Sequence, residues 1–251
     1  MRLSSRISQN VFDYQKALLE CCELIECNSL QLQHFNVSVM TILLAFKEPF
    51  GKSTLSNLAR RAGPPICATF SNQISIKLET PDGKCCCKFF QNGKVHVTGT
   101  KSIARAMTTV DDILKEASCV FVLGGFKVEM LNTNLRLHTP ILLTKLCEHA
   151  EKDSNRLQVS YDSSRYPGVK LRLHGCGVML IFSSGSVIFT GCRSPSDVSL
   201  LFEALSDILS KHPEIITCPK KKTVARPKRP KTIYVCGYPR GIVDGILGYS
   251  A

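Results

Sequence analysis

The sequence predicts an α+β protein in which two pseudo-symmetric half-domains share one antiparallel sheet. The first observation is an internal repeat, F-Q-N-G-K-V-H-V-T-G-T-K-S at residues 90–102 and F-S-S-G-S-V-I-F-T-G-C-R-S at residues 182–194, with Phe, Gly, Val, Thr, Gly and Ser at the same offsets. The second is that each copy passes from an apolar strand through a glycine turn into an alternating strand and then an amphipathic helix. Two copies are too few for a solenoid, so the repeat indicates two halves of one structure.

Each half extends upstream of the repeated phrase, and the order of elements is the same in both. The segment F-N-V-S-V-M-T from Phe35 parallels F-K-V-E-M-L-N from Phe126, and each half then reads strand, helix, three strands and helix. We therefore divide the chain into an N-terminal accessory helical segment (1–34), a first repeat (35–118), a second repeat (119–216) and a basic C-terminal tail (217–251).

Four helices in the repeats follow from capping residues and apolar spacing. In the first repeat a helix is predicted over Ser53–Ala62, and in the second a helix is predicted with Thr139 as N-cap and Pro140 as its first residue. The helices that close the two repeats begin after Ser102 and Ser194, and their apolar residues have the spacing of a one-faced helix.

Glycine-marked turns separate the predicted strands, at residues 80–83, 92–93, 174–177 and 184–185. Amphipathic helices beside an antiparallel sheet cover one of its faces and leave the other without a helical cover. The sequence therefore predicts an open sheet face that is available to a partner.

Positive charge is concentrated in the last part of the sequence. Residues 217–251 hold eight Lys or Arg and one Asp, which is +7 of the formal net charge of +12. Three interpretations fit such a segment: a solvated flexible tail, a nuclear localisation signal, or an electrostatic arm for nucleic acid. Its clustered basic residues are Lys220, Lys221, Lys222, Arg226, Lys228, Arg229 and Lys231.

The residue patterns argue against a membrane protein, an enzyme and a metalloprotein. The sequence has no secretory signal and no apolar run approaching the ~18 residues of a membrane span. The 13 cysteines include no C-x-x-C pair, which favours reduced, mostly buried thiols. The six histidines lack metal-ligand spacing, and His174 and His212 are expected at the surface. The G-K-S-T run at 51–54 resembles the end of a phosphate loop, but Phe46 occupies the position of its first glycine. We expect no catalytic residue, no cofactor and no metal.

The repeated phrase resembles the core signature of the TATA-box-binding protein family, where it also occurs once per repeat. The resemblance covers residues 35–212, and its second half adds Tyr166-Pro167-Gly168 and the strand that ends at Phe182. It implies a saddle, in which a curved antiparallel sheet of about ten strands lies under four helices on its convex side. The concave face of such a saddle binds a widened minor groove and bends the DNA; this family is itself a known example of apolar wedges that unstack base steps. The matching residues of the first copy are Phe90, Gly93, Lys94, Thr98, Gly99, Lys101 and Ser102.

The resemblance also implies which residues contact DNA. Tyr166 and Phe70 are expected as wedges in the two stirrups, the loops at the ends of the saddle. Alternation along the strands assigns the other groove contacts, which are Lys88, Phe90, His96 and Thr98 in the first repeat and Val178, Leu180, Phe182, Ile188 and Thr190 in the second. The phosphate contacts expected at the rim are Lys77, Lys94, Lys101, Arg172 and Arg193.

Three departures from the family pattern affect specificity and partners. Val39 and Met130 stand where the family has an Asn in the first strand of each repeat, so that polar readout of the central base steps is missing. Lys88 and His96 replace apolar groove contacts and make the first half more electrostatic. The second stirrup, residues 162–165, lacks the acidic stretch that family members offer to transcription factor IIB.

The resemblance implies a DNA-binding general transcription initiation factor that bends promoter DNA. Its implied partners are the minor groove of double-stranded DNA, general transcription factors of the IIA/IIB type or their functional equivalents, and the RNA polymerase machinery. A nuclear location is expected, or the site of viral transcription if the gene is viral. Two alternatives stay open: a protein-interaction scaffold with the same fold, and a non-specific architectural DNA binder with reduced TATA specificity.

Overall fold

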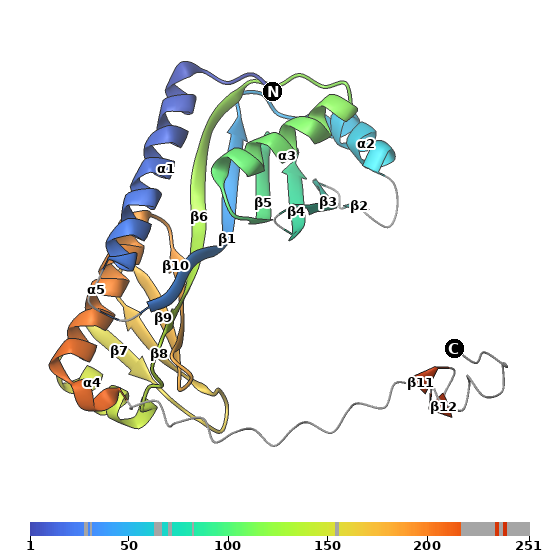
Figure 1. The fold of residues 1–251 in the computed structure, drawn as a ribbon. Helices are drawn as coiled ribbons and strands as arrows, with labels where there is room; N and C mark the ends of the chain where they lie inside the picture. Colours follow the sequence, from blue (N-terminus) through green and yellow to red (C-terminus); the bar gives the residue numbers. More distant parts are fainter. Residues whose placement is uncertain are drawn as a thin grey trace, which may run out of the picture. The chain divides into compact units, whose positions relative to one another are not determined.

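The computed structural model divides the chain into two compact units, Met1–Thr217 and Cys218–Ala251 (Figure 1). In the second unit the described residues form a short antiparallel pair, β11 (Tyr234–Val235) and β12 (Tyr238–Pro239). The residues that the structure describes are 1–27, 30, 32–62, 67–69, 72–81, 83–153, 156–216, 234–235 and 238–239.

The first unit confirms the α+β prediction, with one ten-stranded antiparallel sheet and its helices. Helix α1 (Ser5–Glu26) precedes the repeats. The first repeat consists of β1 (Leu32–Phe46), α2 (Gly51–Ala62), β2 (Cys67–Thr69), β3 (Gln73–Thr80), β4 (Gly83–Phe90), β5 (Lys94–Thr100) and α3 (Ile103–Glu116). The second consists of β6 (Leu123–Leu137), α4 (Leu143–Asp153), β7 (Leu157–Ser160), β8 (Gly168–Leu173), β9 (Gly177–Phe182), β10 (Ser186–Cys192) and α5 (Pro195–Lys211), followed by the 3-10 helix η1 (Pro213–Ile215).

The strand order places the two repeats on either side of the centre of the sheet. The order is β2-β3-β4-β5-β1-β6-β10-β9-β8-β7, so the two long first strands pair in the middle and each half continues outward through its own hairpins. The sheet of this unit is curved, and helices α2 to α5 lie on its convex side (Figure 1). This is the saddle that the resemblance implies.

The register between β1 and β6 reveals a pseudo-two-fold axis. Val39 lies opposite Asn132, and Thr41 lies opposite Met130. Exchanging the two strands turns one pair into the other, so Val39 is equivalent to Met130 and Thr41 is equivalent to Asn132. The structure therefore supports the alignment that places Val39 and Met130 at matching positions of the two repeats.

Alternation along the strands decides which face of the sheet carries the core. Met40, Ile42 and Leu44 of β1 are fully buried, whereas the residues between them are partly exposed. The buried face meets the apolar stripes of α3 and α5, in which Val110 and Leu205 are fully buried. Each such side chain contributes roughly 1.5–3 kcal/mol by leaving water. The face away from the helices remains accessible.

The helices that close the repeats begin where the sequence predicts. The Oγ of Ser102 accepts a hydrogen bond from the backbone N–H of Arg105 at 3.1 Å. Ser194 forms a capping box with Asp197, and Pro195 is the first helical residue. Each cap satisfies a backbone donor that the first turn of a helix leaves without an internal partner.

The predicted start of α4 is wrong. The helix begins at Leu143, and Thr139 and Pro140 lie before it. The two residues between Pro140 and Leu143 donate their backbone N–H groups to the carbonyls of Ser183 and Ile215, at 3.0 and 2.9 Å. Because these tertiary hydrogen bonds hold the chain in another conformation, the helix starts later than the capping pattern suggests.

The sequence pattern also missed the short edge strands β2 and β7. They have three and four residues, too few to show a clear alternation. The four glycine-marked turns do join β3 to β4, β4 to β5, β8 to β9 and β9 to β10, as predicted. Helix α2 begins at Gly51, two residues before the predicted start.

Helix α1 packs along α5 on the convex side (Figure 1). It buries Ile7, Cys21 and Ile25. The hydroxyl of Tyr14 on α1 donates to the carbonyl of Arg193 at 3.4 Å. The N-terminal segment is therefore anchored to the second repeat. None of the helices in the described residues is long and apolar enough to cross a membrane.

The ten cysteines whose side chains the structure describes are free thiols. Four are buried, five are partly buried and Cys27 is exposed. Burial, followed by the negative charge of Asp197, raises the pKa of Cys192 to about 12. A thiol that stays protonated at neutral pH is a poor nucleophile, which fits a packing role.

The expectation for the histidines needs a correction. His174 is exposed, as predicted, but His212 is not a free surface residue. Its side chain is 20% exposed, and its ring stacks on that of His149 with the centroids 3.8 Å apart. The two residues are 63 positions apart, so only the tertiary fold brings them together.

Candidate nucleic-acid interface

The open face of the sheet is defined by the residues that alternate with the core. In β4 the side chains of Cys87 and Phe89 are fully buried. Cys86, Lys88 and Phe90 between and beside them therefore point to the concave side, and they are partly or fully exposed. The same alternation fixes the orientation of side chains on the other strands.

In the first repeat the predicted groove residues form rows across neighbouring strands. Lys88 lies opposite His96 on β5, and His96 lies opposite Leu43 on β1. The rings of Phe90 and His96 approach edge to face, with centroids 5.5 Å apart. Thr98 follows two residues further along β5, opposite Thr41. These side chains thus share one face.

In the second repeat the corresponding rows are more apolar. Leu180 lies between Lys170 on β8 and Ile188 on β10. In the next row, Val178 lies between Arg172 and Thr190.

The second stirrup places its aromatic residue beside the end of β9. The rings of Tyr166 and Phe182 are 5.8 Å apart, and the Nζ of Lys170 lies 4.9 Å from the centre of the Tyr166 ring. This is the cation–π distance range, so the lysine supports the ring from one side. The structure brings both predicted aromatic side chains of this half together at one end of the open face.

The five predicted rim cations are exposed. Lys77 on β3 lies opposite Cys86 on β4 in the strand register. Lys94 is the first residue of β5, and Arg172 lies on β8. Lys101 and Arg193 occupy matching turns just before α3 and α5. The backbone N–H of Arg193 donates to the carboxylate of Asp197 at 2.8 Å, which fixes the turn from which its side chain extends.

Part of the predicted site lies outside the described residues. This holds for the first stirrup wedge, Phe70. It also holds for the tail residues Lys220, Lys221, Lys222, Arg226, Lys228, Arg229 and Lys231.

On β6 the structure adds three polar residues to the open face that the sequence reasoning missed. Leu131 and Leu135 of β6 are buried, so Asn132, Asn134 and Arg136 point the other way and are partly exposed. Alternation with the buried leucines was the signal that could have found them.

Neighbouring groups hold two of these polar side chains in place. The Oδ1 of Asn132 accepts a hydrogen bond from the N–H of Gly191 at 3.3 Å, and Arg136 donates to the Oγ of Ser186 at 3.2 Å. The equivalent positions of β1 carry Thr41, Leu43 and Ala45.

An acidic side chain also lies beside the centre of this face. Glu129 forms an ion pair with Lys127 at 3.0 Å. The hydrogen bond from Lys127, with smaller effects of Arg193 and His96, lowers the pKa of Glu129. A carboxylate here repels phosphate unless Lys127 neutralises it.

The second stirrup is stabilised by a local polar network. The carboxylate of Asp162 accepts hydrogen bonds from the hydroxyl and the backbone N–H of Ser164, at 2.6 and 3.0 Å. These bonds lower the pKa of Asp162. Arg165 pairs with the same carboxylate at 3.3 Å, so the stirrup presents a neutralised acid and not an acidic patch.

Comparisons with known proteins identify relatives of this chain. A family model described as transcription factor TFIID (or TATA-binding protein, TBP) matches residues 125–212. The chain is 30% identical to the TATA-box-binding protein of Methanococcus vannielii over 132 residues, 51% of this chain and 70% of the relative. It is 28% identical over 139 residues to that of Archaeoglobus fulgidus, with coverage of 53% and 74%. It is 28% identical over 144 residues to the TBP-related factor of Drosophila melanogaster, with coverage of 54% and 59%.

A solved structure has the same architecture. The TBP of Methanococcus jannaschii superimposes with a TM-score of 0.59 at 19% identity, covering 71% of this chain and 99% of that chain. At this identity the likeness supports the fold. The relative from Methanococcus vannielii, 30% identical and covered over 70% of its length, shows that the chain belongs to the TATA-box-binding protein family.

Proposed function

We propose that this chain binds duplex DNA with the concave face of its sheet in the minor groove and bends the duplex. Family membership identifies the chain as a TBP-like transcription initiation factor and points away from an enzyme. The observation that carries the DNA-binding proposal is the pair Phe90 and Phe182. Both lie at the ends of equivalent strands, on the open face, beside a second ring.

Aromatic side chains at the two ends of a curved face suit insertion between base steps. Partial unstacking costs a few kcal/mol per step, and the bend offsets this cost because more protein surface then meets the duplex. In the second repeat, Tyr166 and Phe182 form such a wedge with Lys170 beside it. In the first, Phe90 is paired with His96, which makes this wedge more polar.

The exposed cations around the face supply attraction to phosphate. Each phosphate neutralised by Lys or Arg releases counterions, which makes binding strong at low salt and independent of sequence. Lys77, Lys94 and Arg172 are exposed on strands of the sheet, and Lys101 and Arg193 are exposed in the turns before α3 and α5. Lys127 keeps Glu129 paired and so limits repulsion at the centre.

The central strands support a weak sequence preference. The side chains of Val39 and Met130 offer no hydrogen-bond donor to the acceptors of the minor groove. Asn132 and Asn134 do offer amide groups, but only from the second repeat, and Asn132 already binds Gly191. We therefore propose that selection of DNA depends mainly on how easily a sequence bends, which favours flexible pyrimidine–purine steps.

The runner-up is a scaffold that retains the saddle and binds protein on the same face. The presence of Glu129 and the loss of the paired Asn favour this alternative. The two aromatic ends and the ring of cations favour DNA. We propose general transcription factors and the polymerase machinery as partners, and a nuclear location supported by the basic segment 220–231.

A charge reversal on each side of the molecule tests the proposal. Lys88→Glu changes the concave face, and Lys16→Glu changes the exposed outer helix α1 by the same amount of charge. Affinity for a fluorescent A·T-rich duplex is measured by anisotropy at two salt concentrations. We expect Lys88→Glu to weaken binding at least tenfold, about 1.4 kcal/mol, and Lys16→Glu to weaken it less than twofold.

Two results would reject the DNA-binding proposal. Equal losses in both variants would show that binding is not localised to the concave face. Absence of duplex binding by the unmodified protein at low salt would leave the scaffold as the better explanation.

A further inference from the structure

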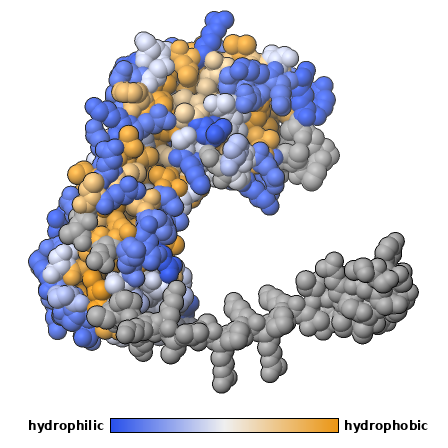
Figure 2. All heavy atoms as spheres, viewed as in Figure 1, coloured by the Kyte–Doolittle hydropathy of each residue, from blue (hydrophilic) through white to orange (hydrophobic). Residues whose placement is uncertain are grey.

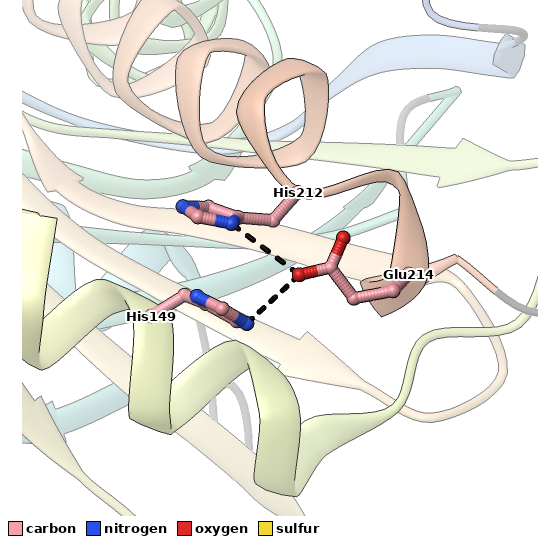
Figure 3. Close-up of side chains that lie close together, drawn as sticks. All are labelled: His149, His212 and Glu214. Atoms are coloured by element: carbon pink, nitrogen blue, oxygen red, sulfur yellow. Dashed lines mark ion pairs between the residues drawn. The ribbon is translucent and has the colours of Figure 1, made fainter.

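A cluster of three potential metal ligands lies in the second repeat, apart from the proposed DNA interface. Figure 3 shows the imidazoles of His149 and His212 pointing toward the carboxylate of Glu214. The Nε2 of His149 is 3.0 Å from the Oε1 of Glu214, and the Nδ1 of His212 is 3.4 Å from the same oxygen. The three ligand atoms all lie within 4.8 Å of one another.

The three side chains come from elements that the fold holds rigidly together. His149 lies on α4, His212 caps the C-terminal end of α5, and Glu214 lies in η1. The backbone N–H of His212 donates to Ile208 at 3.1 Å, and that of Ile215 donates to His212 at 3.0 Å. The positions of the ligands are therefore set before any ion binds, which lowers the entropic cost of binding.

The two separations that involve Glu214 fit a tetrahedral divalent ion. With metal–nitrogen and metal–oxygen bonds of about 2.0–2.1 Å, two ligand atoms of a tetrahedral site lie about 3.3 Å apart. The observed 3.0 and 3.4 Å bracket this value. Because the two imidazoles are stacked at an interplanar angle of 22°, at least one ring must also rotate about its side-chain torsions for both nitrogens to point at one ion.

The chemistry of the set selects among metals. Two imidazoles and one carboxylate suit borderline ions such as Zn²⁺ better than Mg²⁺ or Ca²⁺, which prefer an all-oxygen shell.

We propose that His149, His212 and Glu214 bind one Zn²⁺ ion, with the fourth position filled by water. The side chains of His149 and His212 are 23% and 20% exposed and that of Glu214 is 43% exposed, so an ion can enter from solvent on the side of Glu214. The charges that neighbour the cluster in sequence on α4 and α5 include Glu148, Glu151, Lys152 and the Lys211–Asp207 pair.

The ion would join three elements that already meet through the stacked imidazoles, the two ion pairs of Glu214 and backbone hydrogen bonds. Ile216, the last described residue of this unit, forms a bridge with Ile141. A metal at Glu214 would secure this closing segment to α4. Because only the folded state assembles the three ligands, binding should stabilise the lobe formed by the second repeat.

Calorimetric titration with Zn²⁺ tests the site on the full chain. The protein is first stripped with a chelator and kept reduced at neutral pH. We expect one site of micromolar or tighter affinity, and at about 100 times the dissociation constant a rise in melting temperature of about 5 °C or more.

The variants separate this site from the cysteines and from loss of folding. His149→Gln and Glu214→Gln remove one ligand each, and we expect at least tenfold weaker Zn²⁺ binding in both. His174→Gln removes an exposed histidine elsewhere and should leave binding unchanged. The melting temperatures of the metal-free variants, measured by circular dichroism, show whether each variant is folded. If His149→Gln does not fold, the conservative variant Glu214→Gln alone tests the site.

Co²⁺ reports which atoms bind the metal. At one equivalent, nitrogen and oxygen ligands give visible absorption without the near-ultraviolet thiolate-to-metal transition that cysteine ligation produces. Binding that is unchanged in both ligand variants, a thiolate spectrum at one equivalent, or no binding at micromolar Zn²⁺ would each overturn the proposal. The cluster would then be an ordinary histidine–carboxylate ion pair.

Discussion

In the second repeat the open face presents Val178, Leu180 and Ile188, whereas the equivalent strands of the first present Cys86, Lys88 and His96. The backbone of the two halves is related by a pseudo-two-fold axis, yet the chemistry on their exposed faces differs. Hydrophilic and hydrophobic residues lie next to one another along the inner rim of this unit (Figure 2).

The difference shows that the pseudo-symmetry of the backbone does not by itself fix the residue types, whereas burial does. On the convex side, buried residues of both halves must fill a close-packed core, so matched positions such as Phe89 and Ile181 stay apolar. On the concave side no packing requirement applies, and both halves carry cations there, but Lys88 and His96 of the first half stand where the second has Leu180 and Ile188. We infer that the second repeat supplies most of the wedging.

The largest expected effect concerns stability and two equivalent bulge glycines. Gly99 and Gly191 have φ of +88° and +78°, so any side chain there is strained by about 1–2 kcal/mol. A Cβ on Gly99 would also lie 2.2 Å from the carbonyl oxygen of Lys84, whereas one on Gly191 would meet nothing within 4 Å. The close contact at Gly99 arises because the hairpin of the first repeat is longer: β4 has eight residues, whereas the equivalent β9 of the second repeat has six.

We expect Gly99→Ala to lower the free energy of unfolding by about 1–3 kcal/mol more than Gly191→Ala, because the backbone must shift. Chemical denaturation of both variants measures the difference. Equal losses of unfolding free energy in the two variants would show that the neighbouring hairpin lies equally close to Gly99 and Gly191 in solution. This distinction between the repeats would then be removed.

The next effect concerns the wedges. Phe182→Ala should weaken duplex binding by about 1–3 kcal/mol, the usual contribution of aromatic stacking on a base, with little change in stability because Phe182 is partly exposed. Phe90→Ala should have a smaller effect, since His96 keeps that wedge polar. Anisotropy titrations compare the two. A larger loss for Phe90→Ala would reverse the assignment of roles to the two halves.

Specificity should be weak. With Val39 and Met130 in place of paired Asn, we expect the protein to prefer a TATA element over a scrambled A·T-rich duplex by less than tenfold, about 1.4 kcal/mol. Replacing Asn132 and Asn134 with Val should reduce the preference further if they contact bases. Competition binding at fixed salt measures both, and a hundredfold preference of the unmodified protein would contradict the expectation.

The smallest effect concerns the basic segment outside the described residues. Deleting residues 219–231 should leave the first unit folded, because none of its described elements lies there. If the segment binds phosphates, the slope of log affinity against log salt becomes shallower by roughly 0.9 for each phosphate that its side chains neutralise. An unchanged slope combined with loss of nuclear accumulation would identify it as a localisation signal alone.

Local chemistry made much of the fold predictable. The caps at Ser102 and Ser194, the glycine turns and the alternation in β4 and β9 depend on neighbouring residues, so they can be found in the sequence. The start of α4 could not, because hydrogen bonds to the carbonyls of Ser183 and Ile215 decide it. The pairing of His149 with His212 likewise depends on packing between distant segments.

For the candidate site, alternation along the strands is enough to place Lys88, Phe90, Leu180 and Ile188 on one face. Asn132 and Asn134 were missed because the family pattern marks Met130, two residues earlier, as the central polar position of β6. Whether these side chains contact DNA stays a prediction.

Bending of the duplex tests the central claim most directly. A short A·T-rich duplex with a fluorophore at each end is titrated with protein, and energy transfer between the ends is followed together with anisotropy. If the concave face wedges the groove open, transfer rises as the complex saturates, and Phe90→Ala together with Phe182→Ala abolishes the rise while the protein stays folded. Saturated binding with no change in the distance between the ends would contradict the account.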